Sequence, residues 1–103
     1  TLTKDGTGTL TLTGNNNYSG VTTISEGVVN VRNDYGLGTT GAGTTVATGA
    51  ALQLQGNISV GAESLSLSGT GVSNDGALRN ISGNNSYGGA ITVATASTRI
   101  NSD

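Results

Sequence analysis

Short runs in which aliphatic and polar residues alternate recur along the whole chain. Residues 9–13 alternate Thr with Leu, and residues 28–31 repeat the pattern with Val. Because side chains alternate between the two faces of a strand, each run predicts a short strand with one apolar face. No stretch shows the 3.6-residue period of an amphipathic helix, so almost no helix is expected. The residues predicted to face inward are Leu10, Leu12, Ile24, Val29, Val31, Leu52, Leu54, Leu65 and Leu67.

Turn-forming segments separate the predicted strands. Asn tolerates left-handed backbone conformations and Gly adopts them freely, so residues 32–44 are predicted to be a Gly-rich loop and residues 74–76, Asn-Asp-Gly, a tight turn. Within one strand, the spacing of three between Leu78 and Ile81 predicts a β-bulge or a changed register. The predicted strands span residues 2–5, 9–13, 21–25, 28–31, 45–48, 51–55, 57–60, 64–68, 77–82, 91–94 and 97–100.

The chain contains an internal repeat. Residues 14–20, Gly-Asn-Asn-Asn-Tyr-Ser-Gly, return 69 positions later as residues 83–89, Gly-Asn-Asn-Ser-Tyr-Gly-Gly. The predicted organisation is one segment over residues 1–103, with repeat copies at about 6–32 and 75–101 and connecting coils over 33–74. The same offset superposes Leu12 on Ile81, Thr23 on Thr92, Ile24 on Val93 and Val31 on Ile100.

Two architectures accept many short alternating strands: a parallel β-helix and an antiparallel β-sandwich. Equivalent positions of successive modules hold Leu, Val or Ile, which favours like residues stacking on like in a β-helix, with the β-sandwich as the alternative. At roughly 20 residues per coil the chain would form four to five coils. Its first and last coils would present open strand edges, which invite association.

Composition supports a thin, ordered interior. A third of the 103 residues are hydrophobic and Phe, Trp, Met and Cys are absent, so a thick globular core is excluded. Charged residues make up only 10% of the chain, and β-favourable alternation recurs, which argues against disorder. The net charge of −2 and four scattered basic residues give no basis for nucleic-acid binding. No apolar run approaches the roughly 20 residues of a transmembrane helix, so no membrane insertion by this segment is expected.

Candidate sites are few, and each has a simpler structural interpretation. Residues 36–41 fit the dinucleotide fingerprint Gly-x-Gly-x-x-Gly, but no helix start follows, so a loop is predicted. Tyr18 and Tyr87 are expected to cover the corner of a coil rather than stack on sugars, and Arg32, Arg79 and Arg99 lack an acidic cluster beside them. The six acidic residues show no calcium-binding spacing: Asp5, Glu26, Asp34, Glu63, Asp75 and Asp103. Without His or Cys, we predict no catalytic, cofactor-binding or metal-binding residue.

Residues 6–20, Gly-Thr-Gly-Thr-Leu-Thr-Leu-Thr-Gly-Asn-Asn-Asn-Tyr-Ser-Gly, continued by residues 22–24 and 27–31, resemble the passenger-associated transport repeat, also called the autotransporter-associated β-strand repeat. Residues 75–89 resemble a second, divergent copy. The resemblance implies a right-handed β-helix in the passenger of a large Gram-negative surface protein exported by type V secretion. In that family the repeat is thought to assist export of the passenger, and it carries no catalytic residues.

We therefore expect a non-catalytic structural segment of a secreted or cell-surface passenger, acting as a stalk or spacer and assisting export and folding. Its expected partners are neighbouring coils of the same parent protein, or further copies through end-to-end association. Its expected location is secreted or at the outer surface of a Gram-negative bacterium. The alternatives are a self-assembling subunit of an extracellular filament, and a β-helix that binds or cleaves surface polysaccharide.

Overall fold

A computed structural model describes residues 2–14, 16, 20–38, 43–61, 63–94 and 98–102. Twelve strands and one short 3₁₀ helix occur in these ranges. The strands are β1 (Leu2–Lys4), β2 (Thr9–Leu12), β3 (Thr22–Ile24), β4 (Val28–Val31), β5 (Thr44–Val46), β6 (Ala51–Gln55), β7 (Ser59–Val60), β8 (Leu65–Leu67), β9 (Leu78–Ser82), β10 (Ser86–Tyr87), β11 (Ile91–Val93) and β12 (Ile100–Ser102). The 3₁₀ helix, η1 (Val72–Asn74), forms part of the turn predicted at residues 74–76.

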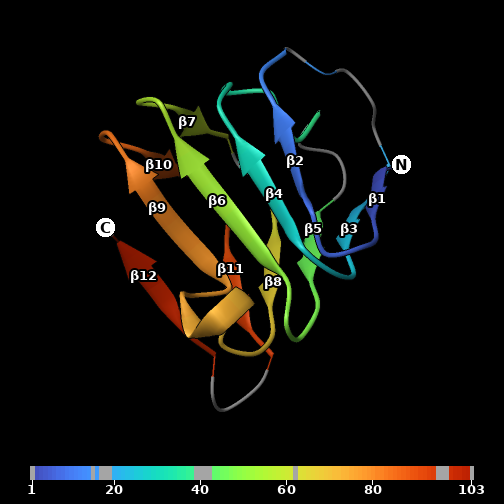
Figure 1. The fold of residues 1–103 in the computed structure, drawn as a ribbon. Coiled ribbons are helices and arrows are strands. Elements are labelled where there is room, and N and C mark those ends of the chain that lie inside the picture. The colour runs from blue at the N-terminus through green and yellow to red at the C-terminus, as the bar shows by residue number, and fades with distance from the viewer. Residues whose placement is uncertain are drawn as a thin grey trace.

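The strands assemble into three sheets in which every pair is parallel. The first sheet has the order β1-β3-β5-β8-β11, and the second has the order β2-β4-β6-β9-β12. A third sheet contains β7 and β10. Figure 1 shows the second sheet across the front of the molecule, with β2 at one end and β12 at the other. Parallel strands stacked in sequence order confirm the predicted β-solenoid, with about four turns, and exclude the antiparallel sandwich.

Successive coils differ in length because the corners between the strands differ. Leu2 of β1 pairs with Thr22 of β3, 20 residues later, whereas Leu65 of β8 pairs with Ile91 of β11, 26 residues later. The strands keep a length of two to five residues throughout. Variable corners between constant strands therefore explain why the sequence has no strict short period.

Aliphatic side chains stack in columns between the sheets. One column of the second sheet runs through Leu10, Val29, Leu52, Leu78 and Ile100. The inward orientation predicted from alternation is confirmed, since Leu10 and Leu12 pack half-buried against the core and the other predicted inward residues are buried. Full burial of an aliphatic side chain contributes about 1.5–3 kcal/mol, so these columns are the main stabilising feature of a hydrophilic chain.

Polar side chains on the outer face of the second sheet also align from strand to strand. The Asn30 amide nitrogen donates to Gln53 Oε1 at 3.0 Å and to Gln55 Oε1 at 3.3 Å. Arg32 Nε donates to Asn30 Oδ1 at 3.0 Å. Asn30 faces away from the core, yet it is only 5% exposed. A buried amide needs hydrogen-bond partners, and these bonds provide them.

Strand β9 contains the irregularity that the spacing of Leu78 and Ile81 predicted. Leu54 pairs with Asn80 and Gln55 pairs with Ser82, so Ile81 is an extra residue without a partner in β6. This β-bulge places Asn80, rather than Ile81, at the inward position beside Leu54.

The last strand differs from its prediction. A strand was expected at residues 97–100, but β12 spans Ile100–Ser102 and residues 95–97 lie outside the described residues. Ile100 pairs with Leu78, whereas the offset of 69 would have placed it beside Ile81. The corner between β11 and β12 is three residues longer than the corner between β3 and β4. Ile100 therefore occupies the position beside Leu78 that the offset of 69 assigns to residue 97.

Candidate functional site: the corner motif and the uncovered end

The corner motif of the second repeat copy, residues 83–89, connects two neighbouring coils through Asn85. Its side-chain oxygen accepts a hydrogen bond from the backbone nitrogen of Ile58 at 2.8 Å. Its amide nitrogen lies 2.6 Å from Asn80 Oδ1, 2.9 Å from the Ser82 carbonyl and 3.3 Å from the Leu54 carbonyl. Asn85 therefore connects the corner to the preceding coil and to the bulged strand β9.

The corner motif of the first copy, residues 14–20, has Asn16 at the equivalent position. Its amide nitrogen donates to the Gly36 carbonyl at 2.8 Å, and its backbone nitrogen donates to the Tyr35 carbonyl at 3.2 Å. Both copies thus use the same asparagine to bond the backbone of an adjacent coil. The rest of this motif, apart from Gly14 and Gly20, lies outside the described residues.

The second corner motif also contains a strand that sequence reasoning missed. No strand was predicted within residues 83–89, but Ser86–Tyr87 forms β10 and pairs with β7. A strand of two residues is too short to show an alternating pattern. The only sequence signal at this position was that residues 83–89 repeat residues 14–20. Together β7 and β10 add a third face to the later coils.

The C-terminal end of the stack leaves apolar side chains uncovered. Ile91 and Val93 of β11 are 38% and 55% exposed, and Ile100 of β12 is 55% exposed. Each occupies a column whose residues in the preceding coils, Leu65, Leu67 and Leu78, are buried. These three side chains, with the edges of β10, β11 and β12, form what we name the uncovered end.

A cleft opens at the uncovered end between the second and third sheets. Tyr87 packs against the core, and its hydroxyl is buried without a hydrogen-bond partner among the described residues. Burial raises the pKa of Tyr87 above its ordinary value, and the nearby Glu63 carboxylate raises it further. The cleft is lined by Leu54, Leu78, Asn80, Asn85, Tyr87, Ile100, Asn101 and Ser102.

Glu63 is a buried carboxyl group in the corner between β7 and β8. Its side chain is 2% exposed, and the Thr44 hydroxyl of β5 donates a hydrogen bond to Oε1. No described residue forms an ion pair with it. Burial raises the pKa of Glu63 above its ordinary value, and the hydrogen bond from Thr44 opposes this only in part. A lone buried carboxyl without a second acidic group beside it does not form a catalytic pair.

The motifs singled out in the sequence do not converge on a catalytic site in the described part of the chain. Residues 36–38 of the dinucleotide fingerprint lie at a turn, with Leu37 buried in the core, and residues 39–41 lie outside the described residues. No group of three metal-ligating side chains occurs in the described ranges. No helix in those ranges is long and apolar enough to cross a membrane.

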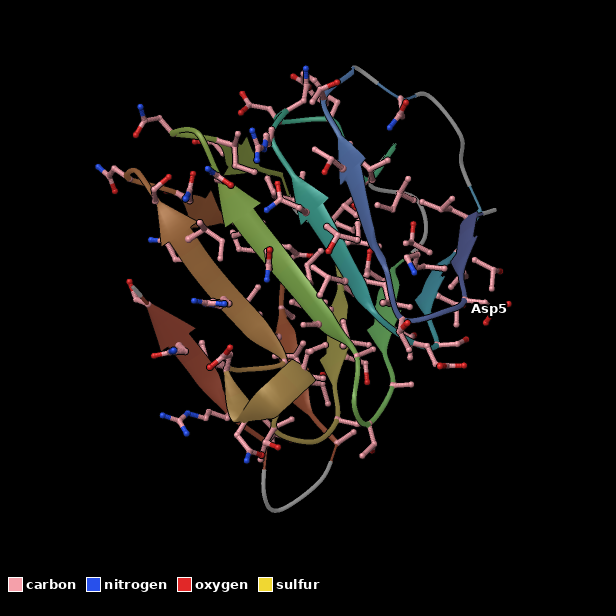
Figure 2. All side chains as sticks on the ribbon, in the orientation of Figure 1. Asp5 is labelled. Atoms are coloured by element: carbon pink, nitrogen blue, oxygen red, sulfur yellow. The ribbon has the colours of Figure 1, made fainter. Side chains whose placement is uncertain are left out.

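The other acidic and aromatic candidates do not gather around Glu63 and Tyr87 in the described part of the chain. Asp5 is exposed at the turn after β1, where Figure 2 shows its side chain at the edge of the molecule. Asp75 forms an ion pair with Arg79 at 3.5 Å beside the η1 turn. Tyr87 contributes to the core and not to an outer sugar-binding platform. Tyr18, the other tyrosine expected to cover the corner of a coil, lies outside the described residues.

Three parallel sheets, aliphatic columns and a repeated asparagine corner define a β-solenoid built from a Gly-, Thr- and Asn-rich repeat. Residues 2–31 match the model of the passenger-associated-transport-repeat, which is the family that the resemblance indicated. The match runs from the start of β1 to the end of β4 and so covers the first two coils. Comparisons with curated proteins and with solved structures gave no match. The repeat implies a passenger-associated transport role in autotransporters, and it suggests a secreted or surface location in Gram-negative bacteria.

Proposed function

We propose that this chain is a non-catalytic structural segment of an exported passenger, in which it acts as a stalk or spacer and assists export by folding coil upon coil. The match to a transport-associated repeat and the solenoid architecture support this assignment. The location that follows is the outer surface of a Gram-negative bacterium or the surrounding medium. The partners that follow are neighbouring coils of the parent protein.

The uncovered end is the observation that carries the proposal. Ile91, Val93 and Ile100 continue the columns of the inner coils in register, and their strands continue the first two sheets. A folded coil therefore presents both a backbone edge and aliphatic contacts to the next segment that emerges. Each added coil buries apolar surface, and this gain in free energy opposes backward sliding of the chain through a narrow pore.

Composition fits transit through such a pore. The chain has no Cys, so disulfide bonds cannot block it, and three Tyr are its only aromatic residues. Its strands span two to five residues, so a small number of emerging residues completes one strand.

Substitution of column residues in the parent protein tests the role in export. Leu52→Asp places a charge at a position that is 0% exposed between Val29 and Leu78, and it should block coil formation. We expect surface display, measured by antibody binding on intact cells, to fall at least several-fold. The matched control is Thr45→Asp, because Thr45 is exposed on the outer face of β5.

Unchanged display of the Leu52→Asp parent, with its solenoid shown to be unfolded by protease digestion at the cell surface, would contradict the export role. Loss of display in the Thr45→Asp control would mean that any added charge blocks passage through the pore. The loss in Leu52→Asp would then no longer support a role for coil folding in export.

The polysaccharide alternative is tested by binding and cleavage assays on a panel of glycans, with no binding expected. The filament alternative depends on what covers the uncovered end.

A further inference from the structure

Two neighbouring coils hold the corner that contains Glu63 from both sides. On one side, a Cβ added to Gly43 would lie 2.9 Å from the carbonyl oxygen of Ser64. On the other side, a Cβ added to Gly89 would overlap the carbonyl group of Glu63. Only glycine fits such close backbone contacts, so the corner between β7 and β8 is packed without space for a further side chain.

Backbone hydrogen bonds close the same region. The backbone nitrogen of Thr44 in β5 donates to the Ser64 carbonyl at 2.8 Å. On the other side, the backbone nitrogen of Gly88, next to β10, donates to the Val60 carbonyl of β7 at 2.8 Å. Glu63 is only 2% exposed while these contacts persist, so water reaches its carboxyl group only when they separate.

The Glu63 carboxyl group has no positive charge beside it to balance an ionised form. It accepts a hydrogen bond from the neutral Thr44 hydroxyl, and no described residue forms an ion pair with it. The titratable group on the strands packed against it is Tyr87 of β10, which stays neutral because burial raises the pKa of Tyr87 well above its ordinary value. Asp34, which accepts a hydrogen bond from the backbone nitrogen of Ser59 in β7, is exposed. An ionised Glu63 is therefore unfavourable as long as the corner stays closed.

We propose that Glu63 acts as a pH-sensitive switch between the coils that contain β7 and β10: its neutral form keeps the corner closed, and its ionisation opens the corner and separates β10 from β7. Release of the proton to solvent leaves a charge that only an open corner can hydrate, so ionisation and opening occur together. This local opening is distinct from the role in export and does not depend on it.

The direction of the pH dependence follows from where the proton is bound more tightly. Burial raises the pKa of Glu63 in the closed corner above the ordinary value of 4.5. Opening is therefore rarest below pH 4.5 and increases as pH rises through the raised pKa. In the first two coils the described acidic residues, Asp5 and Glu26, are exposed, so their ionisation requires no opening.

Residue-resolved amide hydrogen exchange on the full chain tests the switch. Rates at pH 4, 6 and 8, corrected for the intrinsic pH dependence of exchange, report how often each hydrogen bond opens. The probes are the amides of Ser86 and Gly88, which bond β10 to β7, and the references are the amides of Val28 and Arg32, which bond the β4 segment to the β2 segment. From pH 4 to pH 8 the protection of the probes should fall at least about threefold, whereas that of the references should stay constant within error.

Three variants separate the switch from a merely structural role. Glu63→Gln has no charge to release, so the protection of the probes should become independent of pH. Thr44→Val removes the hydrogen bond that partly opposes the raised pKa of Glu63, so the fall in protection should become larger. Asp34→Asn is the matched control, because it neutralises the carboxyl group that bonds β7 and should leave the fall as it is in the natural chain.

Constant protection of the probes in the natural chain would overturn the inference, as would a fall of equal size in the Glu63→Gln variant. An equal fall in the references would also overturn it, because the pH dependence would then come from unfolding of the whole solenoid. Loss of the effect in Asp34→Asn would assign the titration to Asp34 and not to Glu63. Each of these results leaves the proposed role in export unaffected.

Discussion

The two copies of the repeat share a motif, but the structure gives them different surroundings. In the first copy, β2 pairs with β4 without interruption, from Thr9 with Val28 to Leu12 with Val31. In the second copy, β9 is bulged at Ile81 and β12 begins three residues later than the repeat predicts. The motif therefore specifies the corner, whereas the aliphatic columns decide where each strand pairs.

The difference extends to the neighbours of each corner. Asn16 bonds the backbone of a turn in the following coil, while Asn85 bonds the preceding coil, its own corner and the bulged strand. The second corner also packs near the buried carboxyl of Glu63. Equivalent substitutions in the two copies should consequently have unequal effects, and each unequal pair tests the comparison.

The largest difference is expected from the corner asparagines. Asn85→Ala removes the acceptor of the Ile58 amide and an amide group whose two hydrogens are shared among three oxygens. Three hydrogen bonds are lost in effect, so the free energy of unfolding should fall by about 3 kcal/mol, at about 1 kcal/mol for each bond. Asn16→Ala removes one side-chain bond and should lower it by about 1 kcal/mol. Urea unfolding followed by circular dichroism measures both. Equal losses would show that the two corners are energetically the same.

Much of this architecture could be predicted from sequence, because alternation reports directly which face of a strand is apolar. The inward positions of Leu52 and Leu54 and the bulge at Ile81 followed from spacing alone. The register of Ile100 did not, because it depends on the length of a corner and on competition between residues for one column. Nor did the burial of Glu63, since one acidic residue in a polar segment carries no pattern that separates a buried carboxyl from a solvated one.

A smaller difference is expected from the first glycine of each corner motif. Gly83 has a φ of +88°, and a Cβ there would lie 2.7 Å from Asn57 Oδ1 and 2.9 Å from the Asn57 backbone nitrogen. Gly83→Ala should therefore lower the free energy of unfolding by about 2 kcal/mol through backbone strain and displacement of Asn57. At Gly14 no atom of the described residues lies within 4 Å of an added Cβ and φ is not positive, so Gly14→Ala should change stability by less than about 0.5 kcal/mol.

Thermal unfolding of the two alanine variants, followed side by side, checks this pair. The informative result is the difference between them, because both remove a glycine from the same motif position. A Gly14→Ala variant as unstable as Gly83→Ala would mean that the first corner is as constrained as the second. It would also mean that the two copies differ in their strands but not in their corners.

The third prediction concerns pH and Glu63, which lies near the second copy. Because burial raises its pKa in the folded state above the ordinary value of 4.5, the folded protein binds this proton more tightly than the unfolded chain. Its contribution to stability is therefore complete below pH 4.5 and declines as pH rises from there through the raised pKa. Glu63→Gln keeps the shape and a hydrogen-bonding side chain without the charge, so the variant should be more stable than the natural protein at pH 8.

Unfolding midpoints at pH 4 and pH 8 measure this effect. The groups facing Glu63 are the Thr44 hydroxyl and the Tyr87 hydroxyl, and among the described residues no cation pairs with it. At pH 4 the variant and the natural protein should be similar, since both side chains are then neutral. Glu26→Gln, at an exposed position, is the matched control and should not change the pH dependence by a similar amount. Parallel pH profiles for Glu63→Gln and the natural protein would show that the carboxyl is solvated.

The smallest effect is expected at the hydroxyl of Tyr87, the aromatic residue of the second corner. Tyr87→Phe keeps the ring that packs against the core and removes a buried hydroxyl that has no partner among the described residues. A buried hydroxyl without a partner is unfavourable, so its removal should leave the free energy of unfolding unchanged or raise it by up to about 1 kcal/mol. Tyr35→Phe, at a side chain that is 59% exposed, provides the control for loss of a solvated hydroxyl. Urea unfolding measures both, and a loss of more than about 1 kcal/mol in Tyr87→Phe alone would show that the hydroxyl is hydrogen-bonded in solution and that the cleft is already filled at the uncovered end.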